Sequence, residues 1–147
     1  MILKPLGDDY FMRQALKEAD FALKKNEIPV GCVIVCDNQI IARAHNLTET
    51  LNDVTAHAEI QCVTSASNFL GGKYLNECIM YTTLEPCLMC AGALKWAQLN
   101  KLVFGAKDKK TGFSNFKQKT LHLKTKVKGG ILAKECSSLL TKFFKNK

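Results

Sequence analysis

One histidine, one glutamate and two cysteines in this sequence have types and spacings that could do chemistry together. His57 and Glu59 stand in the triplet His-Ala-Glu, and Cys87 and Cys90 frame the segment Cys-Leu-Met-Cys. Cysteine binds metal as thiolate, and the unpaired N–H groups and positive dipole potential of a helix N-terminus lower the pKa of a thiol. Positions 87 and 90 lie one helical turn apart, so both sulfurs can reach one ion.

One imidazole and two thiolates make three protein ligands, and the sequence offers no obvious fourth. Zinc with three protein ligands keeps a tetrahedral position open for water, the arrangement of a catalytic site. We therefore expect His57, Cys87 and Cys90 to hold zinc. Glu59 lies two residues after His57 and would point nearly opposite to it in a regular helix. Both side chains can serve one site only if His57 lies in the first turn.

Each half of the pattern also has an ordinary explanation. A single histidine is commonly a packed core residue, and a glutamate at a helix start is ordinary capping. A Cys-x-x-Cys pair after a strand also fits a dithiol oxidoreductase or a zinc-stabilised binding module. The combination of His-x-Glu with a later Pro-Cys-x-x-Cys is typical of zinc nucleobase deaminases, which favours the metal hypothesis.

Helices and strands alternate along the chain. Apolar spacing and flanking residues predict helices over 9–25, 56–69, 87–99 and 133–144. Strands are expected at 31–37, 39–44, 78–84 and 101–106, and a Lys/Gly-rich segment covers 107–130. Thr55 can cap the second helix, which Gly71 ends, and Pro86 suits the first turn of the third. This alternation predicts an α/β sheet with helices on both faces.

Length and composition exclude several classes of protein. With 147 residues, 47% hydrophobic and 23% charged, the whole chain, residues 1–147, is expected to form a single ordinary folded domain. No apolar run approaches the roughly 18 residues that cross a bilayer, and the opening ten residues lack the apolar stretch of a signal peptide. We expect a cytoplasmic protein with no membrane contact. Five further cysteines are expected to be small buried hydrophobes, at positions 32, 36, 62, 78 and 136.

Charge is distributed unevenly. Residues 1–100 carry 8 Lys+Arg against 11 Asp+Glu, whereas residues 101–147 carry 13 Lys against 2 acidic residues. Such a basic segment is typical of a protein that binds a polyanion, with nucleic acid the first candidate. The alternative is a lysine-rich, solvated surface without a partner, since the chain has 19 Lys and only 2 Arg.

Several segments together resemble the bacterial tRNA-specific adenosine deaminases almost end to end. These are EIPVGCVIV, ARAHN, TAHAE, YTTLEPCLMCAGAL, VFGAKD and the C-terminal GIL…ECSSLL…FF. The chain is less specifically similar to the wider cytidine deaminase-like superfamily, which includes free-base cytosine and guanine deaminases. The resemblance implies a three-layer α/β/α cytidine deaminase-like fold with a mixed central sheet of about five strands.

The resemblance also implies a reaction. It is the hydrolytic deamination of adenosine to inosine at the anticodon wobble position, A34, of a tRNA, with one Zn²⁺ per subunit and no organic cofactor. Glu59 would accept a proton from water, deliver it to purine N1 and then protonate the departing amine. The family match places Asn46, Pro29, Val30 and Ala58 in the substrate pocket, although Asn46 could instead cap its loop and Val30 could belong to the core.

The expected partners are a tRNA anticodon stem-loop and a second copy of the chain, since the family implies a homodimer. Two departures from the family stand out: Val54 replaces a frequent proline before TAHAE, and the segment 107–130 is shorter than in many relatives. The main rival function is deamination of a free base or nucleoside such as guanine, cytosine or adenine. That activity needs the same zinc residues but no basic surface.

Overall fold

The protein is described by a computed structural model over residues 5–146. Residues 1–4, which belong to the opening segment considered above for a signal peptide, and Lys147 lie outside the described residues. The elements are α1 (Asp8–Lys24), β1 (Gly31–Cys36), β2 (Gln39–His45), α2 (Ala58–Leu70), β3 (Cys78–Leu84), α3 (Leu88–Ala97), β4 (Lys101–Ala106), a 3₁₀ turn η1 (Phe113–Asn115), β5 (Lys126–Lys128) and α4 (Ala133–Lys145).

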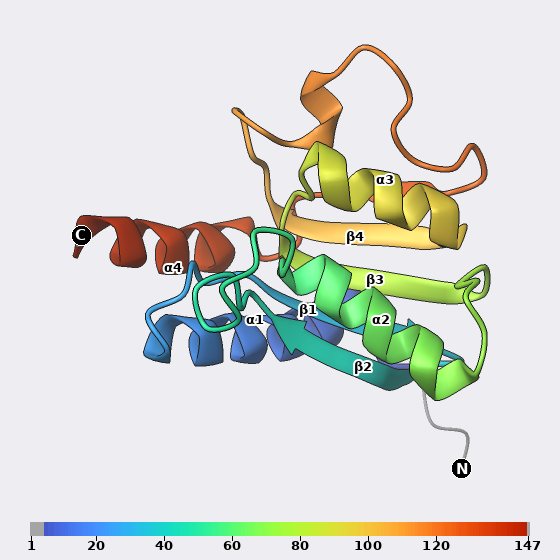
Figure 1. Cartoon of the computed structure of the whole chain (residues 1–147), viewed down its shortest axis with the longest axis horizontal. Coiled ribbons are helices and arrows are strands. Elements are labelled where there is room, and N and C mark those ends of the chain that lie inside the picture. Colours follow the sequence, from blue (N-terminus) through green and yellow to red (C-terminus); the bar gives the residue numbers. More distant parts are fainter. Residues whose placement is uncertain (1–4, 147) are drawn as a thin grey trace.

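The five strands form one mixed sheet in the order β2-β1-β3-β4-β5. Strand β1 runs antiparallel to both β2 and β3, whereas β3, β4 and β5 are parallel. Helices α2 and α3 cover one face of the sheet, and α1 and α4 cover the other (Figure 1). The expected three-layer α/β/α fold is confirmed.

Alternation of side chains along β1 separates two cores. Cys32 and Ile34 pack beneath α2 and α3, and Val33 and Val35 pack against α1 and α4. Helix α1 lies very close to the sheet at Gly31, because a Cβ there would lie 2.0 Å from a backbone oxygen of α1. Helices thus cover both faces of the sheet (Figure 1), and β2 and β5 are its two edge strands.

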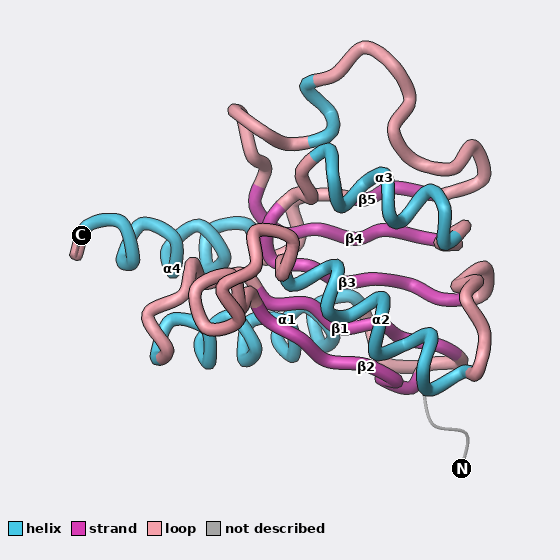
Figure 2. The backbone as a smooth tube through the Cα atoms, in the orientation of Figure 1, coloured by secondary structure: helices cyan, strands magenta, loops and turns pink. Residues whose placement is uncertain are grey.

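Most predicted elements are found within one or two residues of their expected bounds, and the cysteines at 32, 62, 78 and 136 are buried as expected. The same prediction is wrong for Cys36, which is only partly buried because it is the last residue of β1, beside the hairpin turn. Asp37 and Asn38 form the two-residue turn of the hairpin with φ values of 51° and 60°. Strand β5 was not predicted, because all three of its residues are exposed and give no hydrophobic pattern. It lies in the loop-rich region between β4 and α4 that Figure 2 shows.

Two predictions at the helix starts are wrong. Thr55 does not cap α2, because its N–H and its hydroxyl both donate to the Asp53 carboxylate at 2.8 Å, in the turn before the helix. His57 is the N-cap of α2 instead, and the helix begins at Ala58. Pro86 lies before the N-cap of α3, which is Cys87, and not inside its first turn. Both shifts place a proposed metal ligand at the N-cap itself.

Among the described residues, none of the helices has the length and apolar character needed to cross a membrane.

Candidate metal centre

The N-termini of α2 and α3 bring the three predicted ligands together. His57 and Cys87 are the N-caps of the two helices, and Cys90 lies in the first turn of α3. The Nδ1 atom of His57 lies 3.7 Å from the Cys87 sulfur and 3.6 Å from the Cys90 sulfur. These three donor atoms lie within 4.8 Å of one another. Two positive helix ends thus meet where thiolates would gather.

The donor set fits zinc. A tetrahedral ion with a Zn–S distance of about 2.3 Å and a Zn–N distance of about 2.0–2.1 Å separates its nitrogen and sulfur ligands by about 3.6 Å. The two observed distances from His57 Nδ1, 3.7 and 3.6 Å, match that edge. The donor group contains three residues within the described part of the chain. A tetrahedral position for water is therefore available.

Protons are unevenly distributed between the two thiols. Hydrogen bonding with Cys90 and with His57 outweighs burial and lowers the pKa of Cys87 to about 4, so this sulfur is a thiolate at neutral pH. The hydrogen bond from Cys90 to that thiolate, together with burial, raises the pKa of Cys90 far above its usual range. Hydrogen bonding with Cys87 raises the pKa of His57. A metal cation would bind the Cys87 thiolate directly and would displace the proton of Cys90.

Glu59 lies beside this group without belonging to it. Because His57 has extended backbone angles, φ −68° and ψ 154°, it does not follow the helical periodicity that would turn Glu59 away. Both residues therefore face the same cavity, as the sequence required. The Glu59 side chain is 4% exposed, and burial raises its pKa to about 7. A carboxyl of this kind can gain and lose a proton near neutral pH.

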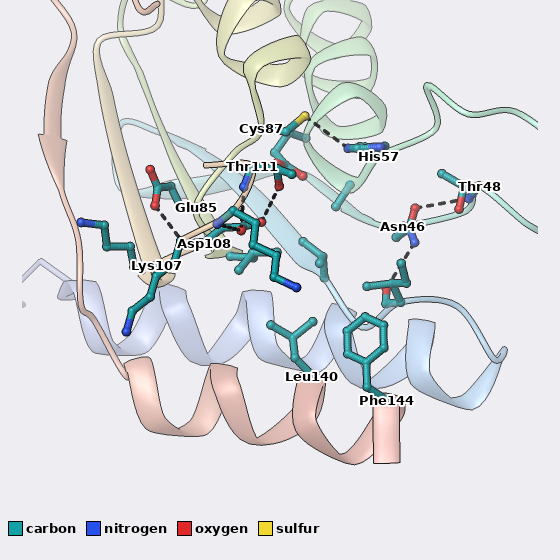
Figure 3. A pocket seen from close by; sticks show the side chains of 17 residues that line it. Asn46, Thr48, His57, Glu85, Cys87, Lys107, Asp108, Thr111, Leu140 and Phe144 are labelled. Carbon is teal, nitrogen blue, oxygen red and sulfur yellow. Dashed lines mark hydrogen bonds between the residues drawn. The ribbon is translucent and has the colours of Figure 1, made fainter. Parts of the chain in front are cut away.

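A cavity of about 590 Å³ opens over the metal centre (Figure 3). Its lining residues come from six parts of the chain: Ile28, Val30, Asn46, Thr48, His57, Ala58, Glu59, Leu84, Glu85, Cys87, Lys107, Asp108, Lys109, Lys110, Thr111, Leu140 and Phe144. Of the four predicted pocket residues, Asn46, Val30 and Ala58 line the cavity. Pro29 is buried between two lining residues but is not one of them.

Asn46 both shapes its loop and faces the cavity. Its side-chain oxygen accepts a hydrogen bond from the Thr48 N–H at 3.3 Å, and its amide donates to the Ile28 carbonyl at 3.4 Å. A primary amide has two N–H donors and an oxygen with two lone pairs. One donor and one lone pair therefore remain for another partner, so loop capping and ligand binding are compatible.

The loop that follows Asn46 is held by a buried glutamate. The side chain of Glu27 is 0% exposed and accepts hydrogen bonds from the Glu49 N–H at 3.0 Å and from the N–H and hydroxyl of Thr50, both at 2.6 Å. Burial alone would raise the pKa of Glu27, but these hydrogen bonds outweigh burial and hold its pKa below the usual value. Glu27 thus fixes one wall of the cavity as a carboxylate.

We expect Glu27→Gln to lower the free energy of unfolding at pH 7 by about 1–3 kcal/mol, because a buried donor loses its charged acceptor. A lowered folded-state pKa stabilises the protein above the unfolded pKa of about 4.3, and that stabilisation disappears as the pH falls through the folded value. Urea titrations at pH 7 and at pH 3–4 check this expectation, with Glu49→Gln, an exposed acid on the same loop, as control. A difference of equal size at every pH would contradict it.

The turn before α2 explains how the chain dispenses with the family's proline. Val54 is 85% exposed, and the turn around it is held by the Asp53 carboxylate and by the Ala56 N–H, which donates to the Asp53 carbonyl at 3.1 Å. The turn that leads into His57 is therefore closed by hydrogen bonds to Asp53 and not by the side chain of Val54.

Sequence reasoning missed several lining residues. Leu140 and Phe144 reach the cavity from α4 (Figure 3). Their apolar spacing predicts a helix, but it does not predict that this helix lies beside the cavity. Thr48 belongs to no motif that would mark it as a lining residue. Glu85 stands directly before Pro86-Cys87, where an acidic residue between a strand and a ligand was a usable signal.

Comparison with known proteins agrees with the fold and the donor set. A family model described as the cytidine and deoxycytidylate deaminase zinc-binding region matches residues 6–106. The tRNA-specific adenosine deaminase of Aquifex aeolicus (strain VF5) is 43% identical over 145 residues, which cover 95% of each chain.

Two solved structures bear on the choice of subfamily. One, from a study of A-to-I editing by tRNA:A34 deaminases at the wobble position of transfer RNA, has a TM-score of 0.84 and 42% identity, and covers 89% of this chain and 99% of that one. A guanine deaminase from Bacillus subtilis has a TM-score of 0.67 and 38% identity, and covers 69% and 66%. From its zinc-type donor set, its fold and this near full-length similarity, the chain belongs to the bacterial tRNA-specific adenosine deaminase family, within the zinc-binding cytidine and deoxycytidylate deaminases.

Proposed function

We propose that this protein hydrolytically deaminates adenosine to inosine in tRNA, at wobble position A34. The observation that carries the proposal is the placement of the buried Glu59 carboxyl beside the His57, Cys87 and Cys90 donors, at the base of a cavity that lysines border. The relative named above as a tRNA-specific adenosine deaminase, and the solved structure from the study of tRNA:A34 deaminases, support the choice of substrate.

His57, Cys87 and Cys90 hold one zinc ion per subunit in this proposal. Zinc with three protein ligands supplies a nucleophile derived from water near neutral pH, by lowering the pKa of water from 15.7 to about 7. Glu59 accepts the proton of this water and delivers it to N1 of adenine while the oxygen bonds to C6. The carboxylate would then take the second proton from the new C6 hydroxyl and pass it to the 6-amino group, so that the C6–N bond breaks, the C6 carbonyl of inosine forms and ammonia leaves.

The remaining pocket residues orient the base. The free donor and lone pair of Asn46 are suited to the edge of a heterocycle. Val30 and Ala58 offer apolar walls. Pro29 lies at the centre of a tight turn in which the Val30 N–H donates to the Ile28 carbonyl at 2.8 Å. The reacting base must leave its stack to reach the metal centre, which favours an unpaired anticodon loop over a duplex.

The basic segment supplies the charge that an RNA substrate needs. Lys107, Lys109 and Lys110 line the cavity and are exposed, whereas Lys117 and Lys119 line a separate hollow along residues 113–127. A free base carries no phosphate and gains nothing from three cations. The position of these lysines therefore favours RNA over the free-base alternative.

Three further properties belong to this proposal. The whole chain, residues 1–147, works as one deaminase domain, which the single sheet shared by all described strands supports. The protein acts as a homodimer, as its family resemblance implies. It acts in the cytoplasm, where tRNA substrates are found.

The rates of ammonia release from an A34 anticodon stem-loop and from free adenine, guanine and cytosine test the substrate class. We expect the stem-loop to be the preferred substrate by kcat/KM. Faster turnover of free guanine or cytosine than of the stem-loop would refute the tRNA assignment while leaving the metal chemistry in place.

We expect the triple replacement of Lys107, Lys109 and Lys110 by alanine to make stem-loop binding weaker and less dependent on salt. For single-stranded RNA, each phosphate contact contributes about 0.7 to the slope of log affinity against log salt. Titrations between 50 and 300 mM salt measure that slope.

The matched control replaces Lys17, Lys73 and Lys95, three exposed lysines outside the cavity lining, by alanine. Zinc content should be unchanged in both triple variants. Equal slopes for the wild type and the first triple variant would mean that the cavity lysines are only solvated surface.

A further inference from the structure

A second buried carboxylate, that of Glu85, stands between β3 and the ligand Cys87. Its side chain is 1% exposed. One carboxylate oxygen accepts a hydrogen bond from the Asp108 N–H at 3.0 Å, and the other accepts from the Ser114 N–H at 2.9 Å. Figure 3 shows the first of these contacts within the cavity lining. Both oxygens are thus committed to the backbone of one segment, residues 107–114.

That segment is the lysine-bearing wall of the cavity. Residues 107–111 line the cavity, and Asp108 closes the turn by accepting hydrogen bonds from the N–H groups of Lys110 and Thr111 at 3.0 Å. The segment also contacts the turn at Pro86-Cys87, which carries a metal ligand. The Phe113 N–H donates to the Pro86 carbonyl at 2.9 Å, and Cys87 forms an isolated β-bridge with Gly112. Glu85 therefore lies between the turn at Pro86-Cys87 and the lysine-bearing segment, residues 107–114.

Packing at this junction is tight. A Cβ added to Gly112 would lie 2.4 Å from the Glu85 Cδ and 2.5 Å from the Asp108 carbonyl oxygen, so the carboxylate packs directly against the loop backbone. Only a carboxylate presents an acceptor to both N–H donors. A glutamine would present one oxygen, and its amide N–H groups would meet the second backbone N–H. One buried donor would then lose its partner.

We propose that Glu85 is a positioning residue that fixes residues 107–114 over the substrate cavity, in register with Cys87. It acts through the loop, since both of its oxygens are bound there, and Glu59 alone carries protons. The expected kinetic effect rests on the proposed function, in which the lysines of residues 107–114 help to bind the RNA substrate. Releasing the wall should raise KM for stem-loop RNA while the turnover step, which the metal centre and Glu59 perform, persists.

The test uses the zinc-loaded full chain and Glu85→Gln. We expect KM for the A34 stem-loop to rise about tenfold or more, the factor for losing one hydrogen bond to a charged group, with kcat within about threefold of the wild type. Zinc content should be unchanged. Amide exchange should quicken at Asp108 and Ser114 by a similar factor. A kcat loss at constant KM, or lost zinc, would make Glu85 a scaffold of the metal centre and overturn the proposal.

Tyr81→Phe is the matched control, because it removes a hydrogen bond of 2.7 Å to another carboxylate, Asp8, outside the cavity lining. It should lower stability without changing KM. Gly112→Ala disturbs the same contact from the loop side and should reproduce the rise in KM if Glu85→Gln does not fold. Unprotected Asp108 and Ser114 amides in the wild type would also overturn the proposal.

The exchange measurement needs no substrate and separates the two proposals. If the wild type does not deaminate the stem-loop, the proposed function fails, and the protection of the two amides still decides whether Glu85 holds the loop.

Discussion

Replacing Glu59 with glutamine is expected to slow deamination of the A34 stem-loop by roughly 100-fold or more while zinc content and fold stay unchanged. Glutamine matches the shape of glutamate but neither accepts nor delivers a proton. The carboxyl is buried, has a pKa raised to about 7, and stands beside the donor group without belonging to it. The loss should therefore fall on kcat, and binding of the stem-loop should change little.

Single-turnover rates and zinc analysis of purified Glu59→Gln check this expectation. Glu77→Gln, an exposed acid in the turn before β3, is the control and should match the wild type. Normal turnover by Glu59→Gln would show that Glu59 is not the proton carrier. A loss of zinc from that variant would show instead that Glu59 belongs to the metal ligands.

Removal of zinc is expected to lower the deamination rate by roughly 1,000-fold or more, because the metal and its activated water stabilise the transition state by several kcal/mol. Cys90→Ala should have the same consequence, since only His57 and Cys87 would remain of the donor group. The variant should also unfold more readily, because metal binding adds to folding free energy. Re-addition of zinc should restore the chelated wild type but not the variant.

Elemental analysis beside activity measurements checks these expectations. Cys36→Ser alters a partly buried cysteine outside the donor group and should keep both metal and activity. Full activity in protein shown to contain no metal would contradict the assigned chemistry.

The parts of the site that the sequence predicts are those fixed by local geometry. The spacing of Cys87 and Cys90 allows both sulfurs to reach one metal ion. The spacing of His57 and Glu59 requires His57 to lie at the helix start, where it is the N-cap of α2. The strands and helices around them were predictable for the same reason. Their apolar repeats reflect burial on one face of a helix or on both faces of a sheet.

What the sequence does not predict depends on contacts between distant segments. Nothing in the α4 pattern shows that Leu140 and Phe144 face a cavity built by loops from the other end of the chain. Thr55 has the residue type of a helix cap, but Asp53 competes for its N–H and hydroxyl. The partners of Glu85 are a further case: its place before Pro86-Cys87 is visible in the sequence, but the two N–H groups that it accepts from lie more than twenty residues away.

The position of inosine in a tRNA transcript tests the central claim most directly. A full-length tRNA with A34 is incubated with the zinc-loaded protein, reverse-transcribed and sequenced, since inosine pairs with cytosine and is recorded as guanosine. We expect conversion at position 34, no conversion at other adenosines, and conversion at position 34 that is slower by roughly 100-fold or more with Glu59→Gln. An unchanged A34 in a preparation that deaminates free guanine or cytosine would contradict it.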